Sequence, residues 1–256
     1  MKQILTGVFK KLVIAERLAL IVNSVYGNIA EHSGYSLLPV MFIQALYIYS
    51  DFSGYTDIAL GIARMFGINL TNNFSRPFFS TNVTNFWRKW HISLSTWCND
   101  YIFKTIIFRK RKWGIKAAVY GVFITFFIIG LWHGPTWTYV ILGILQGLAI
   151  NYEFFSKKKR LEIGSKIPVF WNNLLSRFIT FSFFGFSLIF FFSPSIKEAS
   201  YFVTHLFYFP EIVGFENTLG LAFKDIIIVL LGIVLLFSVE IAEETVDLHT
   251  KLLDQP

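Results

Sequence analysis

The sequence is poor in charge and in cysteine. Only 15% of its 256 residues are charged, whereas soluble domains carry about 25%. With 54% hydrophobic and 19% aromatic residues, this excludes an ordinary soluble domain and predicts a polytopic α-helical membrane protein. The one cysteine, Cys98, excludes an internal disulfide. It has no histidine within four residues to activate it, which favours a buried apolar side chain over an acyl-accepting nucleophile.

Metal-ligand spacings such as HExxH and CxxC are missing, and so is a phosphate-binding glycine loop. We therefore expect no metal site and no bound cofactor. The net charge of +7 would suit nucleic acid, but the cations cluster between apolar runs, in KTIIFRKRKWGIK (104–116) and SKKKRLEIGSK (156–166). Cytoplasmic loops of membrane proteins carry Lys and Arg in this way. The expected contacts are with membrane lipid and not with nucleic acid.

Long uncharged runs predict the membrane spans. Residues 117–152 contain no Asp, Glu, Lys or Arg and are long enough for two helices of about 17 residues, separated at HGPT. Further spans are predicted at 178–196 and 221–240. Because the two basic loops flank a pair of spans, both are expected in the cytoplasm, with residues 197–224 outside.

Charges interrupt the apolar runs nearer the N-terminus. Residues 4–26 carry Lys, Arg and Glu, which favours a helix that packs on other protein. Residues 36–66 predict one kinked helix, in which Asp51 and Asp57 are six positions apart and therefore serve helix pairing, not acid–base catalysis. A carboxylate facing lipid would be costly, so both must face protein. Residues 68–84 are polar and turn-like.

The tract NFWRKWHISLS places three basic residues among aromatic ones. We expect it in an aromatic helix over residues 86–103 that is short, tilted or re-entrant. Trp87, His91 and Ser95 would then share one face, with Arg88 beside it. Such a face suits a polar passage that attracts an anionic group. The alternative is an interfacial aromatic belt with snorkelling cations.

The tract GLWHG places His133 at the end of the span that begins near Ala117. A histidine at membrane depth must face protein or water, and its ring can accept a proton near neutral pH. Gly130 and Gly134 are expected to leave room for a substrate beside the ring, and Pro135 to end the helix. The alternative is a histidine that only caps the helix.

Three motifs occur in one order: YSDFSGYTDIALGIARMFGINLTNNFSRPF, NFWRKWHISLSTWCNDYIF and GLWHGPTWTYVILGILQG. Together they resemble the membrane-bound O-acyltransferase (MBOAT) family, most closely its bacterial branch of alginate O-acetylases and peptidoglycan O-acetyltransferases, over roughly residues 7–155. The resemblance implies an all-α core of about 5–7 membrane helices plus the aromatic helix, in one domain over residues 1–256. Members of this branch begin with further membrane helices, so we expect the chain to be the C-terminal part of a longer protein.

The resemblance implies acyl transfer through the core of an inner (cytoplasmic) membrane. It implies that His133 is the catalytic base and that His91 is a second catalytic residue along the same tunnel. The donor would be a cytoplasmic thioester, acetyl-CoA for this branch. The acceptor would be an extracytoplasmic polysaccharide such as alginate or peptidoglycan, or a secreted acyl-accepting partner protein. The residues expected to bind the donor are Asn85, Trp87, Arg88 and Ser95.

Two alternative functions stay open. A D-alanyl transfer protein of teichoic-acid modification has similar motifs and uses a carrier-protein thioester, although DFSGYTDIALGIARMFG resembles the acetylase branch more closely. The second alternative is a membrane transporter without acyl-transfer chemistry, in which intramembrane histidines relay protons. No inverted repeat of hydropathy, as found in many transporters, is visible in the sequence.

Overall fold

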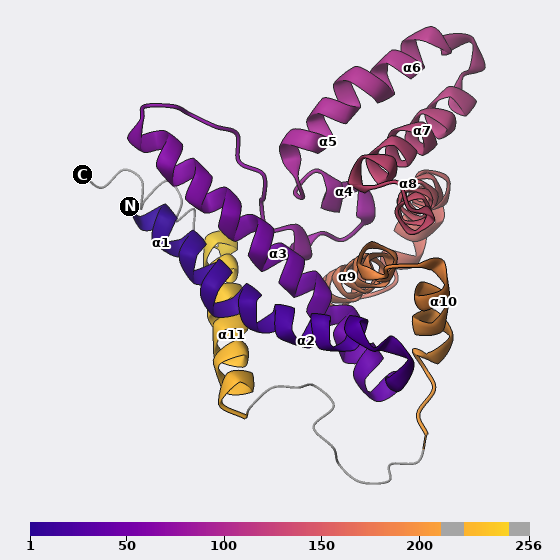
Figure 1. Cartoon of the computed structure of the whole chain (residues 1–256). Coiled ribbons are helices and arrows are strands. Elements are labelled where there is room, and N and C mark those ends of the chain that lie inside the picture. The colour runs from indigo at the N-terminus through magenta and orange to yellow at the C-terminus, as the bar shows by residue number, and fades with distance from the viewer. Residues whose placement is uncertain (211–222, 246–256) are drawn as a thin grey trace.

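A computed structural model describes residues 1–210 and 223–245, and within these ranges the chain is all-α, as predicted. The helices, in chain order, are α1 (Lys2–Val8), α2 (Glu16–Gly27), α3 (Gly34–Met65), α4 (Val83–Trp87), α5 (Ile92–Cys98), α6 (Lys104–Arg109), α7 (Ile115–His133), α8 (Trp137–Gly164), α9 (Val169–Phe192), α10 (Ile196–His205) and α11 (Phe223–Thr245) (Figure 1). Two π-helical segments, η1 (Phe9–Ala15) and η4 (Asn99–Phe103), and three short 3₁₀ turns, η2 (Ile29–Glu31), η3 (Pro77–Phe79) and η5 (Arg111–Trp113), connect them.

Three helices of the described part, α7, α8 and α9, are long and apolar enough to cross a membrane. They confirm the two spans predicted within residues 117–152, with a break directly after His133, and the span predicted at 178–196. The span predicted at 221–240 falls on α11, whose described apolar stretch, Leu230–Ile241, is shorter than a span. The further membrane helices of the predicted 5–7 stay a prediction.

The N-terminal helices α1 and α2 run along α3 (Figure 1), which confirms that residues 4–26 pack on protein. A side chain at Gly7 would place its Cβ 2.5 Å from the Gly54 carbonyl oxygen, so glycine permits the close crossing of α1 and α3. The predicted helix over residues 36–66 is confirmed as one continuous helix, α3, that contains Pro39. The fully buried side chains that join α2, α3, α9 and α10 include Leu18, Val22, Val25, Leu37, Val40, Ile189 and Phe202.

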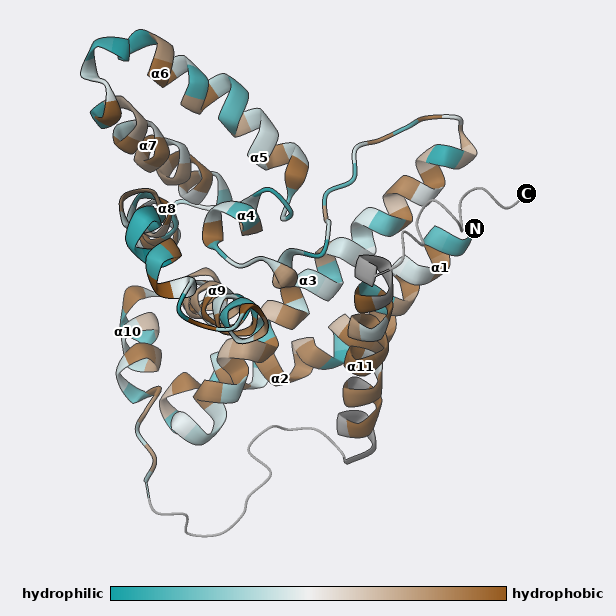
Figure 2. Ribbon diagram, turned by 180° about the vertical axis from the view of Figure 1, so that it is seen from behind, coloured by the Kyte–Doolittle hydropathy of each residue, from teal (hydrophilic) through white to brown (hydrophobic). Residues whose placement is uncertain are grey.

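The two basic segments predicted as loops are largely helical. Residues 104–109 form α6, and α8 continues through its Lys and Arg residues to Gly164. Lys, Arg, Leu and Glu are strong helix formers, and charge alone gives no reason for a helix to end. α8 ends at a glycine and is followed by Pro168. Figure 2 shows hydrophilic residues along α6 and at one end of α8, in contrast to the apolar α7.

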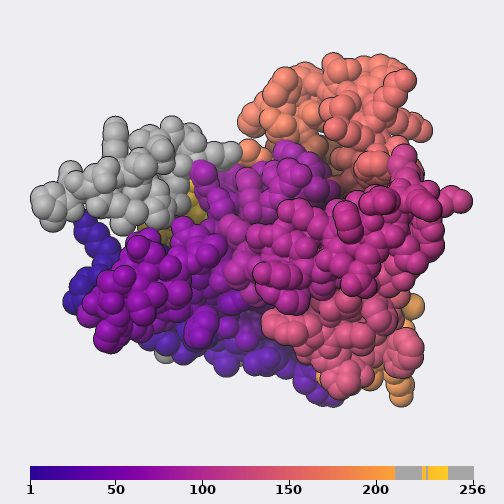
Figure 3. All heavy atoms as spheres, turned by 90° about the horizontal axis from the view of Figure 1, so that it is seen from above, coloured from indigo at the N-terminus to yellow at the C-terminus, as the bar shows by residue number. Residues whose placement is uncertain are grey.

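The predicted continuous helix over residues 86–103 is wrong. α4 ends at Trp87, and α5 begins only at Ile92, after His91 adopts a left-handed conformation. The cause is a contact with a distant part of the chain, because Phe74 and Trp90 form an antiparallel β-bridge. Trp87, His91 and Ser95 therefore do not share a helix face. In the space-filling view the magenta segment that contains α5 and α6 borders the salmon residues near the end of α8, and purple residues separate it from the indigo N-terminal helices (Figure 3).

Candidate functional site

Two cavities lie beside each other in the described part of the chain. The first, here called the histidine cavity, has a volume of about 350 Å³ and is lined by residues of α3, α7, α8, α9 and the α4–α5 segment. The second, here called the basic cleft, has a volume of about 1150 Å³ and lies among α4, α5, η4, α7, α8 and α9. The histidine cavity is defined by Asp51, Phe52, Trp87, His91, Phe126, Ile129, Trp132, His133 and Gln146. The basic cleft is defined by Thr84, Trp87, Arg88, Ser95, Cys98, Phe126, Ile129, Glu153, Lys157 and Arg160.

The two histidines singled out by the sequence lie in the same cavity. The His91 ring lies against Phe52, with 4.8 Å between ring centroids, and 6.3 Å from the Trp132 ring. His133 lies in the last turn of α7, and its ring centroid is 4.9 Å from that of Trp132 and 5.2 Å from that of Phe191. Nδ1 of His91 is buried and has no hydrogen-bond partner among the described residues. The cavity thus combines apolar walls with two imidazoles.

The glycines beside His133 serve the packing of helices, while Gly130 also lines the histidine cavity, so the expectation that they leave room for a substrate stays a prediction. A Cβ at Gly134 would lie 2.6 Å from the Tyr139 ring, and a Cβ at Gly130 would collide with the Tyr139 carbonyl oxygen. Tyr139 belongs to α8, and its ring lies 6.0 Å from that of His133. The two glycines therefore let α8 pack closely on the histidine end of α7.

Cations gather along the basic cleft. Arg88 and Lys157 line it and form no ion pair with any residue that the structure describes. Arg160 donates to the Ser156 hydroxyl at 3.2 Å and to the Glu153 carbonyl oxygen at 3.1 Å. The cleft therefore presents positive charge, which suits an anionic ligand.

Glu153 contributes the one carboxylate among the described residues that line this cleft. Its two carboxylate oxygens accept hydrogen bonds from Val83 N at 2.5 Å, from Thr84 N at 2.9 Å and from the Thr84 hydroxyl at 2.6 Å. These contacts fix the start of α4 on α8. The carboxylate is thereby occupied with the start of α4, and its single negative charge leaves the cleft, with Arg88, Lys157 and Arg160, positive overall.

Lys157 and Arg160 are cleft residues that the sequence pattern did not reveal, because their charges were assigned to a loop. The available signal was the spacing of Glu153, Lys157 and Arg160, which puts them on one face if the helix continues. Gln146 was missed as well. A glutamine inside an uncharged span is itself a signal, because its amide must find partners within the protein.

The two cavities share a wall formed by Trp87, Phe126 and Ile129. The Trp87 ring packs on Phe126, with 5.0 Å between centroids. Its indole Nε1 donates to Gln146 Oε1 at 3.0 Å, and Gln146 Nε2 donates to the Ser187 hydroxyl at 2.8 Å. Because the same three residues line both cavities, a group bound against them in the cleft lies next to the histidine cavity.

The remaining site candidates take different places. Arg88 and Ser95 line the basic cleft, whereas Asn85 lines neither cavity and donates its backbone N–H to Asn82 Oδ1 at 2.8 Å. Cys98 is buried, as predicted, with 3% of its surface exposed, and borders the cleft.

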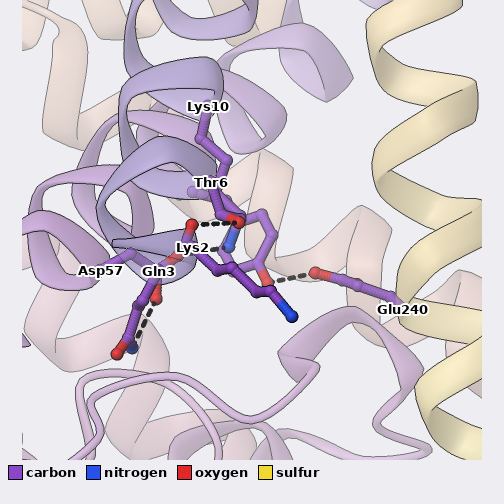
Figure 4. A network of polar contacts seen from close by, with 7 residues as sticks. Lys2, Gln3, Thr6, Lys10, Asp57 and Glu240 are labelled. Carbon is purple, nitrogen blue, oxygen red and sulfur yellow. Dashed lines mark hydrogen bonds and ion pairs between the residues drawn. The ribbon is translucent and has the colours of Figure 1, made fainter. Parts of the chain in front are cut away.

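The two aspartates of α3 pair helices, as predicted. Lys10 contacts Asp57 at 2.9 Å, and Lys11 contacts Asp51 at 2.5 Å. Gln3 also donates to Asp57, at 3.3 Å (Figure 4). A hydrogen bond also joins α11 to α3 in this region. The hydroxyl of Tyr49 on α3 donates to the carboxylate of Glu240 on α11 (Figure 4).

Comparison with known proteins places this architecture in a family. The model of MBOAT, the membrane-bound O-acyltransferase family, matches residues 21–193, a range that contains the lining of both cavities. The chain belongs to this family, which confirms the resemblance seen in its motifs. Membership of this family, together with the apolar helices α7, α8 and α9, identifies the chain as a membrane protein.

Three relatives show the range of similarity. A teichoic acid D-alanyltransferase of Bacillus subtilis is 36% identical over 174 residues, which is 64% of this chain and 41% of that protein. A probable alginate O-acetylase of Pseudomonas syringae is 38% identical over 148 residues, 57% of this chain and 28% of that protein. A peptidoglycan O-acetyltransferase of Helicobacter pylori is 32% identical over 195 residues, 75% of this chain and 36% of that protein. The alignments thus span 28–41% of the length of these relatives.

Proposed function

We propose that this chain carries the acyl-transfer centre of a membrane O-acyltransferase. It moves an acetyl group from acetyl-CoA to a hydroxyl of an extracytoplasmic polysaccharide such as alginate or peptidoglycan. The observation that supports this most is the contact between a basic cleft and a cavity with two imidazoles through the shared wall of Trp87, Phe126 and Ile129. A cation-lined cleft suits an anionic donor, and paired imidazoles suit proton transfer.

The size of the basic cleft supports a large donor. Small-molecule pockets typically measure about 300–1,000 Å³, and this cleft reaches about 1150 Å³. Arg88, Lys157 and Arg160 would contact the phosphate groups of the donor. In this proposal its thioester end passes between the side chains of the shared wall into the histidine cavity, which His133 and His91 line.

His133 acts as the general base in the proposed reaction. It accepts the proton of the acceptor hydroxyl while the hydroxyl oxygen attacks the thioester carbonyl carbon. The carbon–sulfur bond then breaks, and the proton passes from His133 to the departing thiolate. A positioned base of this kind contributes about 10²–10⁴-fold to the rate.

His91 and Arg88 have separate tasks in this proposal. His91 donates a hydrogen bond to the carbonyl oxygen as negative charge develops there, a role that the place of its ring in the lining of the histidine cavity supports. Arg88 lines the cleft and not the histidine cavity, so its task is to bind the anionic part of the donor.

The test of the catalytic role is the variant His133→Ala, assayed for acetylated product after solubilisation or in vesicles. Transfer should fall at least about 100-fold, because the base is lost, while membrane insertion is retained. His205→Ala is the matched control, because His205 ends α10 and lines neither cavity. Product at the control level from His133→Ala would overturn the assignment.

The proposed direction of transfer depends on which side of the membrane each end of α7 and α8 faces. We propose an inner membrane with the basic segments in the cytoplasm, so that Lys157 and Arg160 face the cytoplasmic donor. α7 rises about 27 Å between Ile115 and His133, which carries His133 toward the opposite face. In a Cys98→Ala background, Lys112→Cys and Lys158→Cys should react with an impermeant maleimide only from the cytoplasmic side. Labelling of either from outside would reverse the direction.

D-alanyl transfer is the second candidate function, favoured by the similarity to the D-alanyltransferase of Bacillus subtilis over 64% of this chain. The same cleft and base would serve, with a carrier-protein thioester as donor. Incubation with labelled acetyl-CoA and, separately, with a D-alanyl carrier protein distinguishes the two. Transfer from acetyl-CoA alone is the expected result, and transfer from the carrier alone would reassign the donor.

A further inference from the structure

His91 has a backbone conformation that side chains other than glycine rarely adopt. Its φ of 44° and ψ of 54° lie in the left-handed region, which only one other non-glycine residue of the described chain, Arg76, enters. The Cβ of an L-residue is crowded there, so the surrounding contacts must hold it in place. The aromatic tract itself shows the spacing of a continuous helix, which would carry His91 through in a right-handed conformation.

The polar segment after α3 supplies those contacts on both sides of His91. Before it, Phe74 bridges Trp90, and Ser75 N donates to the Lys89 carbonyl oxygen at 3.0 Å. After it, Asn73 makes three contacts. Its carbonyl oxygen accepts from Ile92 N at 3.0 Å, and its side-chain Oδ1 accepts from Ser93 N at 3.1 Å and from the Ser93 hydroxyl at 2.6 Å.

We propose that Asn73 is a positioning residue for the transfer reaction: its side chain holds the start of α5 so that His91 stays left-handed with its ring in the histidine cavity. The role in transfer rests on the proposed function, whereas the role in holding His91 does not. Without the side-chain contact, α5 can extend backward through His91. The ring would then share a face with Ser95, which lines the basic cleft, and would leave Phe52 and Trp132.

The first test measures the accessibility of position 91 and does not require enzymatic activity. In a Cys98→Ala background, His91→Cys places a thiol in the cavity, where an impermeant maleimide should react slowly. Adding Asn73→Ala should raise the labelling rate severalfold, because position 91 turns toward the open cleft. Asn72→Ala is the matched control, because this neighbour is exposed and should leave the rate unchanged. A labelling rate that Asn73→Ala does not change overturns the inference, whether or not the chain transfers acyl groups.

The second test measures transfer by Asn73→Ala with the native His91. The kcat per folded enzyme should fall about 10- to 100-fold, because a catalytic group is displaced. The donor KM should change by less than about threefold, because the cleft cations Lys157 and Arg160 lie on α8 and keep their places. Asn73→Asp keeps an acceptor oxygen for Ser93 and should restore most of the kcat. A residue with only a structural role would lower the yield of folded enzyme and leave its kcat unchanged, which would overturn the positioning role.

The outcomes separate the inference from the proposed function. Faster labelling together with a lower kcat supports both. If Asn73→Ala speeds labelling but the chain with native Asn73 and His91 transfers no acyl group, the proposed function is contradicted. The conformational role of Asn73 is then still supported. If Asn73→Ala does not fold, Ser93→Ala removes the hydroxyl contact alone and should change both readouts in the same direction by less.

Discussion

Charged side chains are arranged differently in two regions of the molecule. Between η1 and α3, cations and carboxylates face each other in pairs, Lys10 with Asp57 and Lys11 with Asp51. Along the basic cleft, Arg88 and Lys157 form no ion pair within the described residues, and the nearby carboxylate of Glu153 is bonded to the start of α4. Paired charges join helices, whereas cations without carboxylates are available to a ligand.

The difference explains why the same residue types have different consequences when changed. Removal of one member of a pair leaves the other without compensation, which lowers the free energy of unfolding. Removal of a cleft cation leaves no such partner behind, so the fold is little affected and the loss falls on binding. Substitutions between η1 and α3 should therefore lower stability and leave donor affinity unchanged, whereas substitutions along the basic cleft should lower donor affinity and leave stability unchanged.

Among the substitutions of charged residues in these two regions, the largest effect is expected for Arg88→Ala. It should raise the donor KM about tenfold or more, because a charge-assisted hydrogen bond contributes about 1.5–3 kcal/mol, and leave the melting temperature close to that of the wild type. Arg109→Ala is the control, because Arg109 is exposed at the end of α6 and outside both cavities. Equal KM values for Arg88→Ala and Arg109→Ala would remove the distinction between the two regions.

A smaller effect, on stability, is expected for the aspartates of α3, of which Asp57 lies outside both cavities and Asp51 borders the histidine cavity. Asp57→Asn should lower the free energy of unfolding by about 1–3 kcal/mol, because the pair with Lys10 is mostly buried, with 20% and 15% of the two side chains exposed. Asp51→Asn should lower it by less than about 1 kcal/mol, because its pair is 40% and 39% exposed. Denaturation of the purified variants checks the order, with the exposed Asp100→Asn as control. A larger loss for Asp51→Asn would contradict the role of burial.

Local patterns in the sequence were sufficient for the spans and for the paired aspartates. The absence of charge from residues 117–152 predicted α7 and α8, and the high energy of a carboxylate in lipid predicted that Asp51 and Asp57 face protein. The shared location of His91 and His133 was implied only by resemblance to the family, because nothing local joins two residues on different helices.

Two of the features that were missed or predicted wrongly have non-local causes, and one had a local signal. The break at His91 depends on Asn73 and Phe74, which lie outside the aromatic tract, so helical spacing within the tract gave the wrong continuation. The basic face of α8 was missed because a cluster of cations suggested a loop, although Lys and Arg continue a helix readily. The close contact of Gly130 with the backbone of Tyr139 was not predicted, because it follows only from the packing of α7 on α8.

A measurement of donor binding distinguishes the roles of the two cavities most directly. Calorimetric titration with acetyl-CoA should give His133→Ala a Kd within about threefold of the wild type, although it transfers at least about 100-fold less, because the base acts after the donor is bound. Arg88→Ala should bind about tenfold more weakly or worse, because the cleft holds the anionic part of the donor. Loss of acetyl-CoA binding in His133→Ala, with normal binding in Arg88→Ala, would contradict the assignment of binding to the basic cleft and of chemistry to the histidine cavity.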